Sequence, residues 1–252
     1  MIFHDRRHAG QVLGERPRGL GEDAAWPSPG VDPIAFDAEV AIPMAAVTRS
    51  GHLTMPSLCQ GIVVIAHSCR SSRSSPRTRS IARALNQAGF GTLLLDLLSE
   101  DEATDRRYVF DIDLLAGRLD AATDWLAGHD DARGRRIGYF GASTVAAAAL
   151  SAAASSESRV SAVVSRGGRP DLVIPRLAAV RAPTLLIVGS RDDVVLDLNM
   201  KAAGHLRCPH RVAAVTGATH LFEEPDALER VARLTTDWFD EHLVANPSSV
   251  ST

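Results

Sequence analysis

The sequence has few cysteines and no closely spaced cysteine pair. Cys59, Cys69 and Cys208 are the only three in 252 residues. An odd number without a close pair argues against a disulfide framework and against a cysteine-based zinc site. We therefore expect a reducing, cytoplasmic location and no bound metal.

The sequence also lacks a large charge excess and a long apolar run. The net charge is −3, which gives no general attraction to nucleic acid or to an anionic membrane. No run approaches the roughly 18 apolar residues of a membrane span, and the charged residues 5–7 are not followed by the apolar segment of a signal peptide. The sequence predicts a soluble, unsecreted protein without a nucleic-acid or membrane partner.

Residues 1–33 contain prolines and glycines but show no apolar periodicity. We interpret this segment as a poorly ordered leader and residues 245–252 as a disordered tail. The intervening residues 34–244 are long enough, in a chain that is 45% hydrophobic, to bury one α/β core.

Short β-type runs alternate with helical patterns over this domain. Strands are expected at 37–42, 51–55, 61–67, 91–97, 136–140, 161–166, 183–189 and 211–216. Helices are expected at 77–88, 111–127, 144–155, 175–180, 197–206 and 225–243. Several of the strands are apolar on both faces, which is typical of a parallel sheet covered by helices.

The helix expected at 111–127 shows the complementary pattern, with one apolar face. The residues on this face are Ile112, Leu115, Leu119, Ala122 and Leu126. Together these patterns predict a doubly wound, mostly parallel α/β sheet, preceded by an antiparallel pair of strands.

Ligands of such a sheet bind beyond the carboxyl ends of its strands, so the residues that follow each strand are the candidates for a site. Ser143 follows strand 136–140, Asp192 follows strand 183–189, and His220 follows strand 211–216. Serine, acid and histidine in this chain order are typical of a nucleophile elbow followed by its acid and its base.

Each of these residue types has a reason in the chemistry of acyl transfer. A serine hydroxyl is a weak nucleophile until an imidazole takes its proton, and a carboxylate behind the imidazole fixes its tautomer. The backbone N–H of Thr144, where the next helix starts, would face a developing oxyanion. A second donor is expected from Ser68 or Cys69, in the loop after strand 61–67.

Non-catalytic interpretations of the same residues remain open. Ser143 could be an ordinary N-cap, and Asp192 and Asp193 could both be turn carboxylates; for Asp193 we prefer the capping role. His220 could be a loop histidine with a structural partner. His67 also ends a strand, and we interpret it as a structural residue that holds the oxyanion loop.

The segments around these residues resemble the dienelactone hydrolase branch of the α/β-hydrolase superfamily. The resemblance covers about residues 36–244 and is carried by "IGYFGAST" (137–144), "APTLLIVGSRDD" (182–193), "TGATHLFEEP" (216–225) and "HSCRSSRSSPRTR" (67–79). It implies an α/β-hydrolase fold without a lid domain. It also implies Ser143 as nucleophile, Asp192 as triad acid and His220 as base.

The leader "FHDRRHAGQVLGERP" resembles the opening of a phosphoribosyltransferase domain, which some members of this branch carry in front of the hydrolase. Only the start of such a domain is present and no phosphate-binding loop follows it. We therefore expect no transferase function from this chain.

Two turns depart from the family pattern. The elbow is G-x-S-x-G in the family, whereas Val145 stands here in place of the second glycine. The loop after the first parallel strand reads His-Gly-x-Gly in the family, whereas this chain has Ser68 and Arg70 at the glycine positions. A side chain at such positions can displace the nucleophile or the oxyanion donors.

One local concentration of positive charge lies in the loop and helix start after strand 61–67. It consists of Arg70, Arg73, Arg77 and Arg79. Such clusters are usually solvated, but Arg70 or Arg73 could contact an anionic part of a substrate.

Two functions are therefore compatible with the sequence. The first is a serine hydrolase that cleaves a small carboxylic ester, lactone or thioester through an acyl-enzyme, with a small-molecule substrate and no cofactor. The alternative is a catalytically weakened or inactive α/β-hydrolase-fold protein that binds a small molecule or a partner. The sequence leaves the oligomeric state open.

Overall fold

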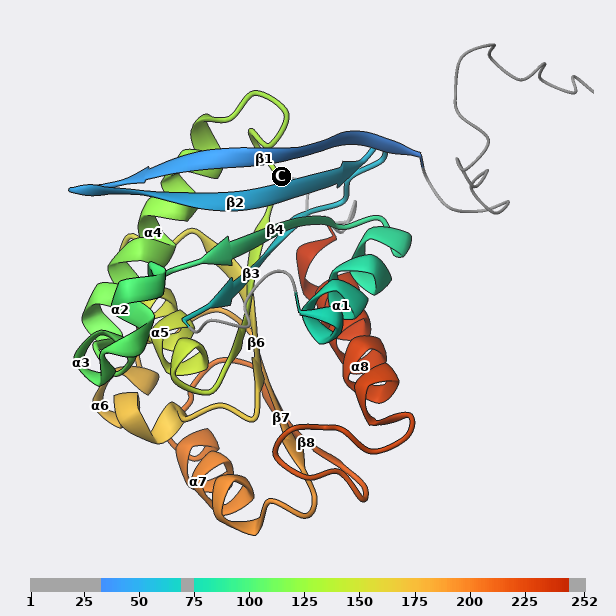
Figure 1. Cartoon of the computed structure of the whole chain (residues 1–252). Helices are drawn as coiled ribbons and strands as arrows, with labels where there is room; N and C mark the ends of the chain where they lie inside the picture. Colours follow the sequence, from blue (N-terminus) through green and yellow to red (C-terminus); the bar gives the residue numbers. More distant parts are fainter. Residues whose placement is uncertain (1–32, 69–74, 245–252) are drawn as a thin grey trace, which may run out of the picture. The chain divides into compact units, whose positions relative to one another are not determined.

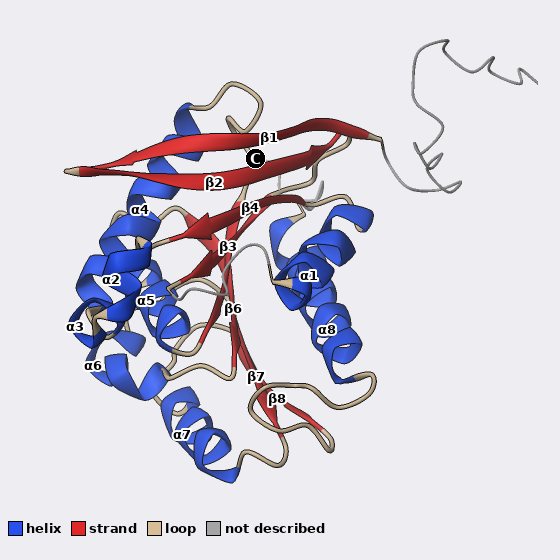
Figure 2. Ribbon diagram, viewed as in Figure 1, coloured by secondary structure: helices blue, strands red, loops and turns tan. Residues whose placement is uncertain are grey.

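The computed structural model describes residues 33–68 and 75–244, which form an eight-stranded sheet with helices on both faces (Figures 1 and 2). The strands are β1 (Ile34–Met44), β2 (Val47–Pro56), β3 (Ile62–His67), β4 (Gly91–Asp96), β5 (Ile137–Ala142), β6 (Val160–Arg166), β7 (Thr184–Gly189) and β8 (His210–Val215). The helices are α1 (Pro76–Gln87), α2 (Glu100–Thr104), α3 (Arg106–Val109), α4 (Ile112–Gly128), α5 (Thr144–Ala153), α6 (Ile174–Leu177), α7 (Asp193–Ala203) and α8 (Ala227–Leu243), with a 3₁₀ turn at Pro170–Val173. The leader, the tail, Cys69, Arg70 and Arg73 lie outside the described residues.

The strand order is β1-β2-β4-β3-β5-β6-β7-β8. β1 pairs with β2, and β2 with β4, in antiparallel orientation, whereas β4, β3, β5, β6, β7 and β8 are parallel. The predicted doubly wound sheet and its preceding antiparallel pair are confirmed. The carboxyl ends of the parallel strands meet at one edge, where the candidate residues follow β5, β7 and β8.

Two hydrophobic clusters cover the two faces of the sheet. One is built around α4 and α5, and the other around α1 and α8, which lie on the opposite side of the strands (Figure 1). The central strands contribute alternate side chains to both clusters, which explains why they are apolar throughout. The predicted inner face of α4 is confirmed at Leu115, Leu119, Ala122 and Leu126, and Ile112 is partly buried against the same cluster.

The helical boundaries differ from the sequence prediction at several places. α2 and α3 were not predicted, although Ser99 and Glu102 form a capping box at the start of α2. α7 begins four residues earlier than expected, because Asp192 accepts a hydrogen bond from the backbone N–H of Val195. The short helix expected at 175–180 is displaced to Ile174–Leu177 and follows the 3₁₀ turn.

No helix in residues 33–68 and 75–244 is both long and apolar enough to cross a membrane.

Candidate active site

Ser143 lies at a strained corner between β5 and α5. Its backbone has φ 53° and ψ −126°, which is an uncommon conformation for a residue with a side chain. The corner directs the chain from the strand straight into the helix, and the Ser143 side chain is exposed. Its hydroxyl does not cap α5. The simple N-cap interpretation of this serine is therefore wrong.

The corner is tight because α5 starts directly against the end of β5. A Cβ on Gly141 would lie 2.9 Å from the backbone nitrogen of Ala146, so a larger residue would push the helix away. Val145, at the position of the family's second glycine, is 2% exposed and belongs to the cluster around α4 and α5. Its side chain is thus accommodated in the core.

Asp192 and His220 are in contact. The Nδ1 atom of His220 lies 2.6 Å from Oδ2 of Asp192, and the two side chains are 47% and 16% exposed respectively. The other carboxylate oxygen, Oδ1, accepts the N-cap hydrogen bond of α7. The structure therefore brings together the acid and the base that the sequence predicts, and Nε2 of the imidazole has no hydrogen bond to any described residue.

The prediction that Asp193 caps α7 is wrong. Asp192 is the N-cap of α7, and Asp193 is the exposed first residue of the helix. One carboxylate serves both His220 and the helix, because its two oxygens face different partners.

The loop that carries His220 is fixed against the end of β7. A Cβ on Gly189 would lie 2.4 Å from the carbonyl oxygen of Thr219, so only glycine permits this approach. The N–H of Arg191 donates to the carbonyl of Ala218 at 2.9 Å, and the N–H of Thr219 donates to Oε1 of Glu224 at 2.9 Å. These bonds hold the segment before His220 from both sides.

The end of β6 connects the Ser143 corner with His220. Ala142 is in register with Arg166, and a Cβ on the next residue, Gly167, would lie 3.4 Å from Cε1 of His220. The N–H of Arg169 donates to the carbonyl of Ser143 at 3.2 Å. His220 therefore lies beyond the strand adjacent to the serine-bearing strand.

Within the described residues, the Ser143 hydroxyl makes no hydrogen bond, and the bond to His220 that a complete triad requires is not formed here. Catalytic hydrogen bonds in free enzymes are often long and tighten only when substrate binds.

The oxyanion donors are described in part. Thr144 is the first residue of α5, so its backbone N–H is one of the donors that the helix itself leaves without a partner. Ser68 is buried, and its φ is not positive. Cys69, the other predicted donor, is outside the described residues, as are Arg70 and Arg73.

His67 has a structural environment, as predicted. Its Nε2 atom lies 3.1 Å from the hydroxyl of Thr78 in α1. Burial, together with the nearby positive charge of Arg166, lowers the pKa of His67 to about 4. The ring is therefore neutral at physiological pH and accepts or donates one hydrogen bond to α1, which begins just after the predicted oxyanion loop.

Two contacts near the site were missed by sequence reasoning. Asn199 of α7 is fully buried, and its side-chain amide donates to the carbonyl of Gly168 at 3.0 Å. Arg77 of α1 forms an ion pair with Glu223, three residues after His220. The only sequence signal for the first contact is an asparagine on the apolar side of a predicted helix. The second contact joins residues that are far apart in the sequence, so the sequence alone does not pair them.

Among the described residues, no group of three or more His, Cys, Asp or Glu side chains is arranged to hold a metal ion.

Comparison with known structures identifies the family. The dienelactone hydrolase from Anabaena variabilis is 47% identical, has a TM-score of 0.79, and matches over 82% of this chain and 98% of its own. The chain belongs to the dienelactone hydrolase family. An esterase from Pyrococcus furiosus has a TM-score of 0.67 at 17% identity, and it shows that the α/β-hydrolase fold is shared more widely.

Among curated proteins, a Mycobacterium tuberculosis protein named "Putative phosphoribosyl transferase" is 54% identical to the present chain over 212 residues. The match covers 84% of this chain and 48% of the relative, so the chain spans about half the length of that relative. No family model matches the sequence. The name of the relative refers to the same class of domain, phosphoribosyltransferase, whose opening the leader resembles.

Proposed function

We propose that the protein is a serine hydrolase that cleaves a small carboxylic ester, lactone or thioester through an acyl-enzyme. The observation that carries this proposal is the strained corner at Ser143, where an exposed hydroxyl is not used as a helix cap. A backbone held in a sparsely populated conformation costs of order 1–3 kcal/mol and is characteristic of functional sites. The contact between His220 and Asp192 near this corner supports the same function.

In the proposed reaction, Nε2 of His220 takes the proton of the Ser143 hydroxyl as Oγ attacks the substrate carbonyl carbon. Asp192 accepts the Nδ1–H hydrogen bond and stabilises the imidazolium. The imidazolium then returns the proton to the leaving oxygen or sulfur, and a water molecule, activated by the same histidine, releases the acid from Ser143.

The negative charge on the substrate oxygen would be stabilised by the backbone N–H of Thr144 and by one from Ser68 or Cys69. Arg70 and Arg73 are proposed contacts for an anionic part of the substrate. The triad needs no cofactor. We also expect a reducing, cytoplasmic setting, in which the buried thiols of Cys59 and Cys208 stay free.

Labelling with a serine-directed fluorophosphonate probe tests this function. We expect the parent protein to label and Ser143→Ala to remain unlabelled, with Ser151→Ala as a matched control that labels like the parent, since Ser151 is buried in the last turn of α5. A panel of aryl esters and lactones then measures turnover of the same variants.

Two outcomes would contradict the proposal. If neither the parent nor a Val145→Gly variant labels, the alternative of an inactive fold that binds a small molecule or a partner is favoured. If Ser143→Ala labels as well as the parent, another residue is the nucleophile.

A further inference from the structure

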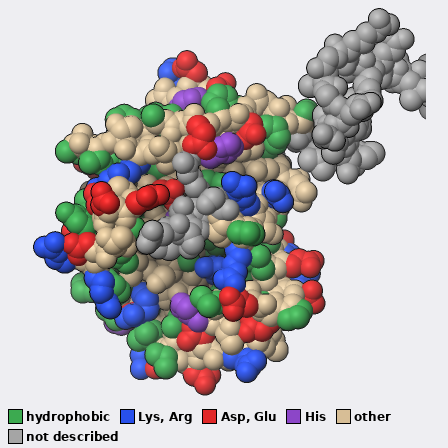
Figure 3. Space-filling model, in the orientation of Figure 1, with side chains coloured by type: hydrophobic (Ala, Val, Ile, Leu, Met, Phe, Trp, Pro, Cys, Tyr) green, Lys and Arg blue, Asp and Glu red, His purple; other side chains and the backbone are tan. Residues whose placement is uncertain are grey.

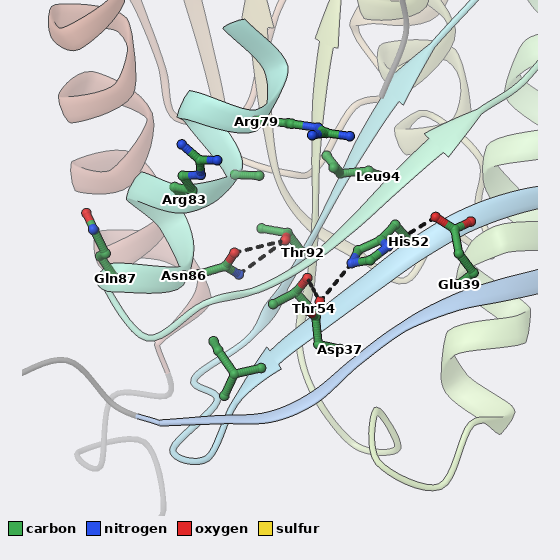
Figure 4. Close-up of a pocket in the computed structure, with 12 residues that line it drawn as sticks. Asp37, Glu39, His52, Thr54, Arg79, Arg83, Asn86, Gln87, Thr92 and Leu94 are labelled. Atoms are coloured by element: carbon green, nitrogen blue, oxygen red, sulfur yellow. Dashed lines mark hydrogen bonds and ion pairs between the residues drawn. The ribbon is translucent and has the colours of Figure 1, made fainter. Parts of the chain in front are cut away.

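A cavity in the described part of the chain lies between the β1–β2 hairpin and α1. Its volume is about 610 Å³, within the range of pockets that hold small molecules. Thr92 and Leu94 of β4 form part of its lining, with the β1–β2 hairpin on one side and α1 on the other (Figure 4). None of the proposed catalytic residues lines it.

The hairpin wall carries a charged cluster. Glu39 is directly opposite His52, and Asp37 is directly opposite Thr54, so all four side chains share one face of the hairpin. Nε2 of His52 lies 2.7 Å from Oδ1 of Asp37, and Nδ1 lies 3.2 Å from Oε1 of Glu39. Only an imidazolium can donate to both carboxylates at once. Although partial burial opposes it, the pKa of His52 is raised by these two hydrogen bonds.

The helix wall presents two arginines. Arg79 and Arg83 are one turn apart on α1, and both line the cavity and are exposed (Figure 4). Neither forms an ion pair with any described residue, in contrast to Arg77 on the same helix, which pairs with Glu223. Asn86 is already engaged with the hydroxyl of Thr92 and the carbonyl of Phe90. The two guanidinium groups are therefore the charged donors that the helix wall offers to a ligand.

The described titratable groups that line the cavity sum to a small positive charge. Asp37 and Glu39 contribute two negative charges, and the imidazolium of His52, Arg79 and Arg83 contribute three positive charges. Figure 3 shows on this face a histidine flanked by acidic side chains, with basic side chains close by. Apolar contacts are available from Ile34, Ala82 and Leu94.

We propose that this cavity is a second binding site, which takes a small organic anion whose carboxylate or phosphate group is held by Arg79 and Arg83 and whose body rests on Leu94 and Ala82. Guanidinium groups match both kinds of anion in geometry and bind them through two parallel hydrogen bonds. The acidic hairpin wall selects against ligands with negative charge at both ends. The site is independent of the hydrolase chemistry at Ser143.

Calorimetric titration with three probes tests the site: benzoate, phenyl phosphate and the neutral benzyl alcohol. We expect either or both anions to bind and the alcohol not to bind, and the stronger anion identifies the acid group that the site prefers. The variant Arg79→Ala/Arg83→Ala should weaken anion binding by about tenfold or more, because it removes both charged donors. Arg233→Ala, which changes an exposed arginine of α8, is the matched control and should leave binding unchanged.

The pH dependence provides a second readout, for which benzoate serves because its charge is constant between pH 6 and 8.5. The groups that face His52 are Asp37 and Glu39 from β1 and the arginines from α1. His52 is charged below its raised pKa and neutral above it, so benzoate should bind more weakly as the pH rises through that value. His52→Gln should bind benzoate more weakly than the parent and should lose this pH dependence.

The proposal is overturned if neither anion binds, or if binding persists undiminished in the double-arginine variant. Binding that is lost in His220→Ala but kept in the double-arginine variant would place the anion in the candidate active site instead. Since Arg79 and Arg83 are exposed, the variant should fold, and its circular dichroism spectrum checks this directly.

Discussion

A mutation of Asp192 can separate its structural role in α7 from its proposed catalytic role. One carboxylate oxygen faces His220 and the other caps α7. Asparagine caps helices about as well as aspartate does, but it cannot stabilise an imidazolium. We expect Asp192→Asn to lower kcat by about 10³-fold or more and to change the free energy of unfolding by less than about 1 kcal/mol, measured by ester hydrolysis and urea unfolding.

Asp193→Asn is the control for this prediction, because Asp193 is the exposed neighbour and does not contact His220. It should retain nearly full activity. Equal losses of activity in both variants would show that the acid of the triad has been assigned incorrectly.

Val145 is part of the hydrophobic core. It is buried in the second position of α5, where glycine would remove a packed side chain and weaken the helix. We expect Val145→Gly to lower the free energy of unfolding by about 3 kcal/mol, from the lost burial, the cavity and the helix propensity of glycine. Urea unfolding of the purified variant measures this.

Val194 offers the matched comparison, because it occupies the second position of α7 and is 72% exposed. Val194→Gly should cost less than about 1 kcal/mol, from helix propensity alone. Similar losses for the two variants would mean that the Val145 side chain contributes nothing to the core.

For individual residues, the sequence predicted that the three candidate residues follow the ends of strands. The pairing of Asp192 with His220 is the one that the family resemblance implied. The sequence-based preference for Asp193 as the cap of α7 was wrong, since Asp192 and Asp193 are chemically identical and only the path of the turn separates them. The conformation of Ser143 was also beyond a sequence argument, because φ depends on how closely α5 packs on β5.

Among the elements, α2 depends on a single charged network. Arg118 of α4 is almost fully buried and donates to both carboxylate oxygens of Glu102 at 2.8 Å, and Arg49 of β2 donates to Oε2 at 2.5 Å. The hydrogen bond from Arg118 is the main reason that the pKa of Glu102 falls to about 2. The carboxylate joins α2 to both α4 and β2.

This network predicts a pH-dependent contribution to stability. Since the pKa of Glu102 is lower in the folded state than its usual value of 4.5, the contribution is complete above that value and is lost as the pH falls toward 2. We expect Glu102→Gln to lower the free energy of unfolding by about 2–3 kcal/mol at pH 7 and by much less near pH 3.

Glu100→Gln, at an exposed site in the same helical turn, should show a small effect that varies little over this range. A Glu102→Gln deficit that stays constant from pH 7 to pH 3 would show that the ion pairs do not stabilise the fold. Unfolding by urea at several pH values measures both variants.

The elements that sequence predicted well are those with long periodic patterns, such as α4 and the strands that are apolar on both faces. α2 and α3 are four or five residues long, and so carry no periodicity to recognise. The capping box of Ser99 and Glu102 was the available signal for α2. The cavity between α1 and the hairpin could not be predicted, because its walls come from segments that only the sheet order brings together.

For the whole molecule, we predict that the residues from Pro33 onward fold without residues 1–32. Among the described residues, the buried members of one hydrophobic cluster run from Ile42 to Cys208 and those of the other from Val63 to Leu243, and β1 itself begins at Ile34. A chain that starts at Pro33 should therefore unfold cooperatively, with a midpoint close to that of the parent, and should label equally with the fluorophosphonate probe.

A shorter chain that starts at Ala46 is the contrasting case. It lacks β1, which pairs with β2 along almost its whole length and buries Ile42 and Met44 almost completely. Losing two such side chains costs about 3–6 kcal/mol, and β2 would become an exposed edge strand. We expect this chain to unfold at a much lower temperature or to aggregate, because its sheet would end at an open edge. If the chain from Pro33 behaved in the same way, the leader would be part of the folding unit, and the boundary predicted near residue 33 would be wrong.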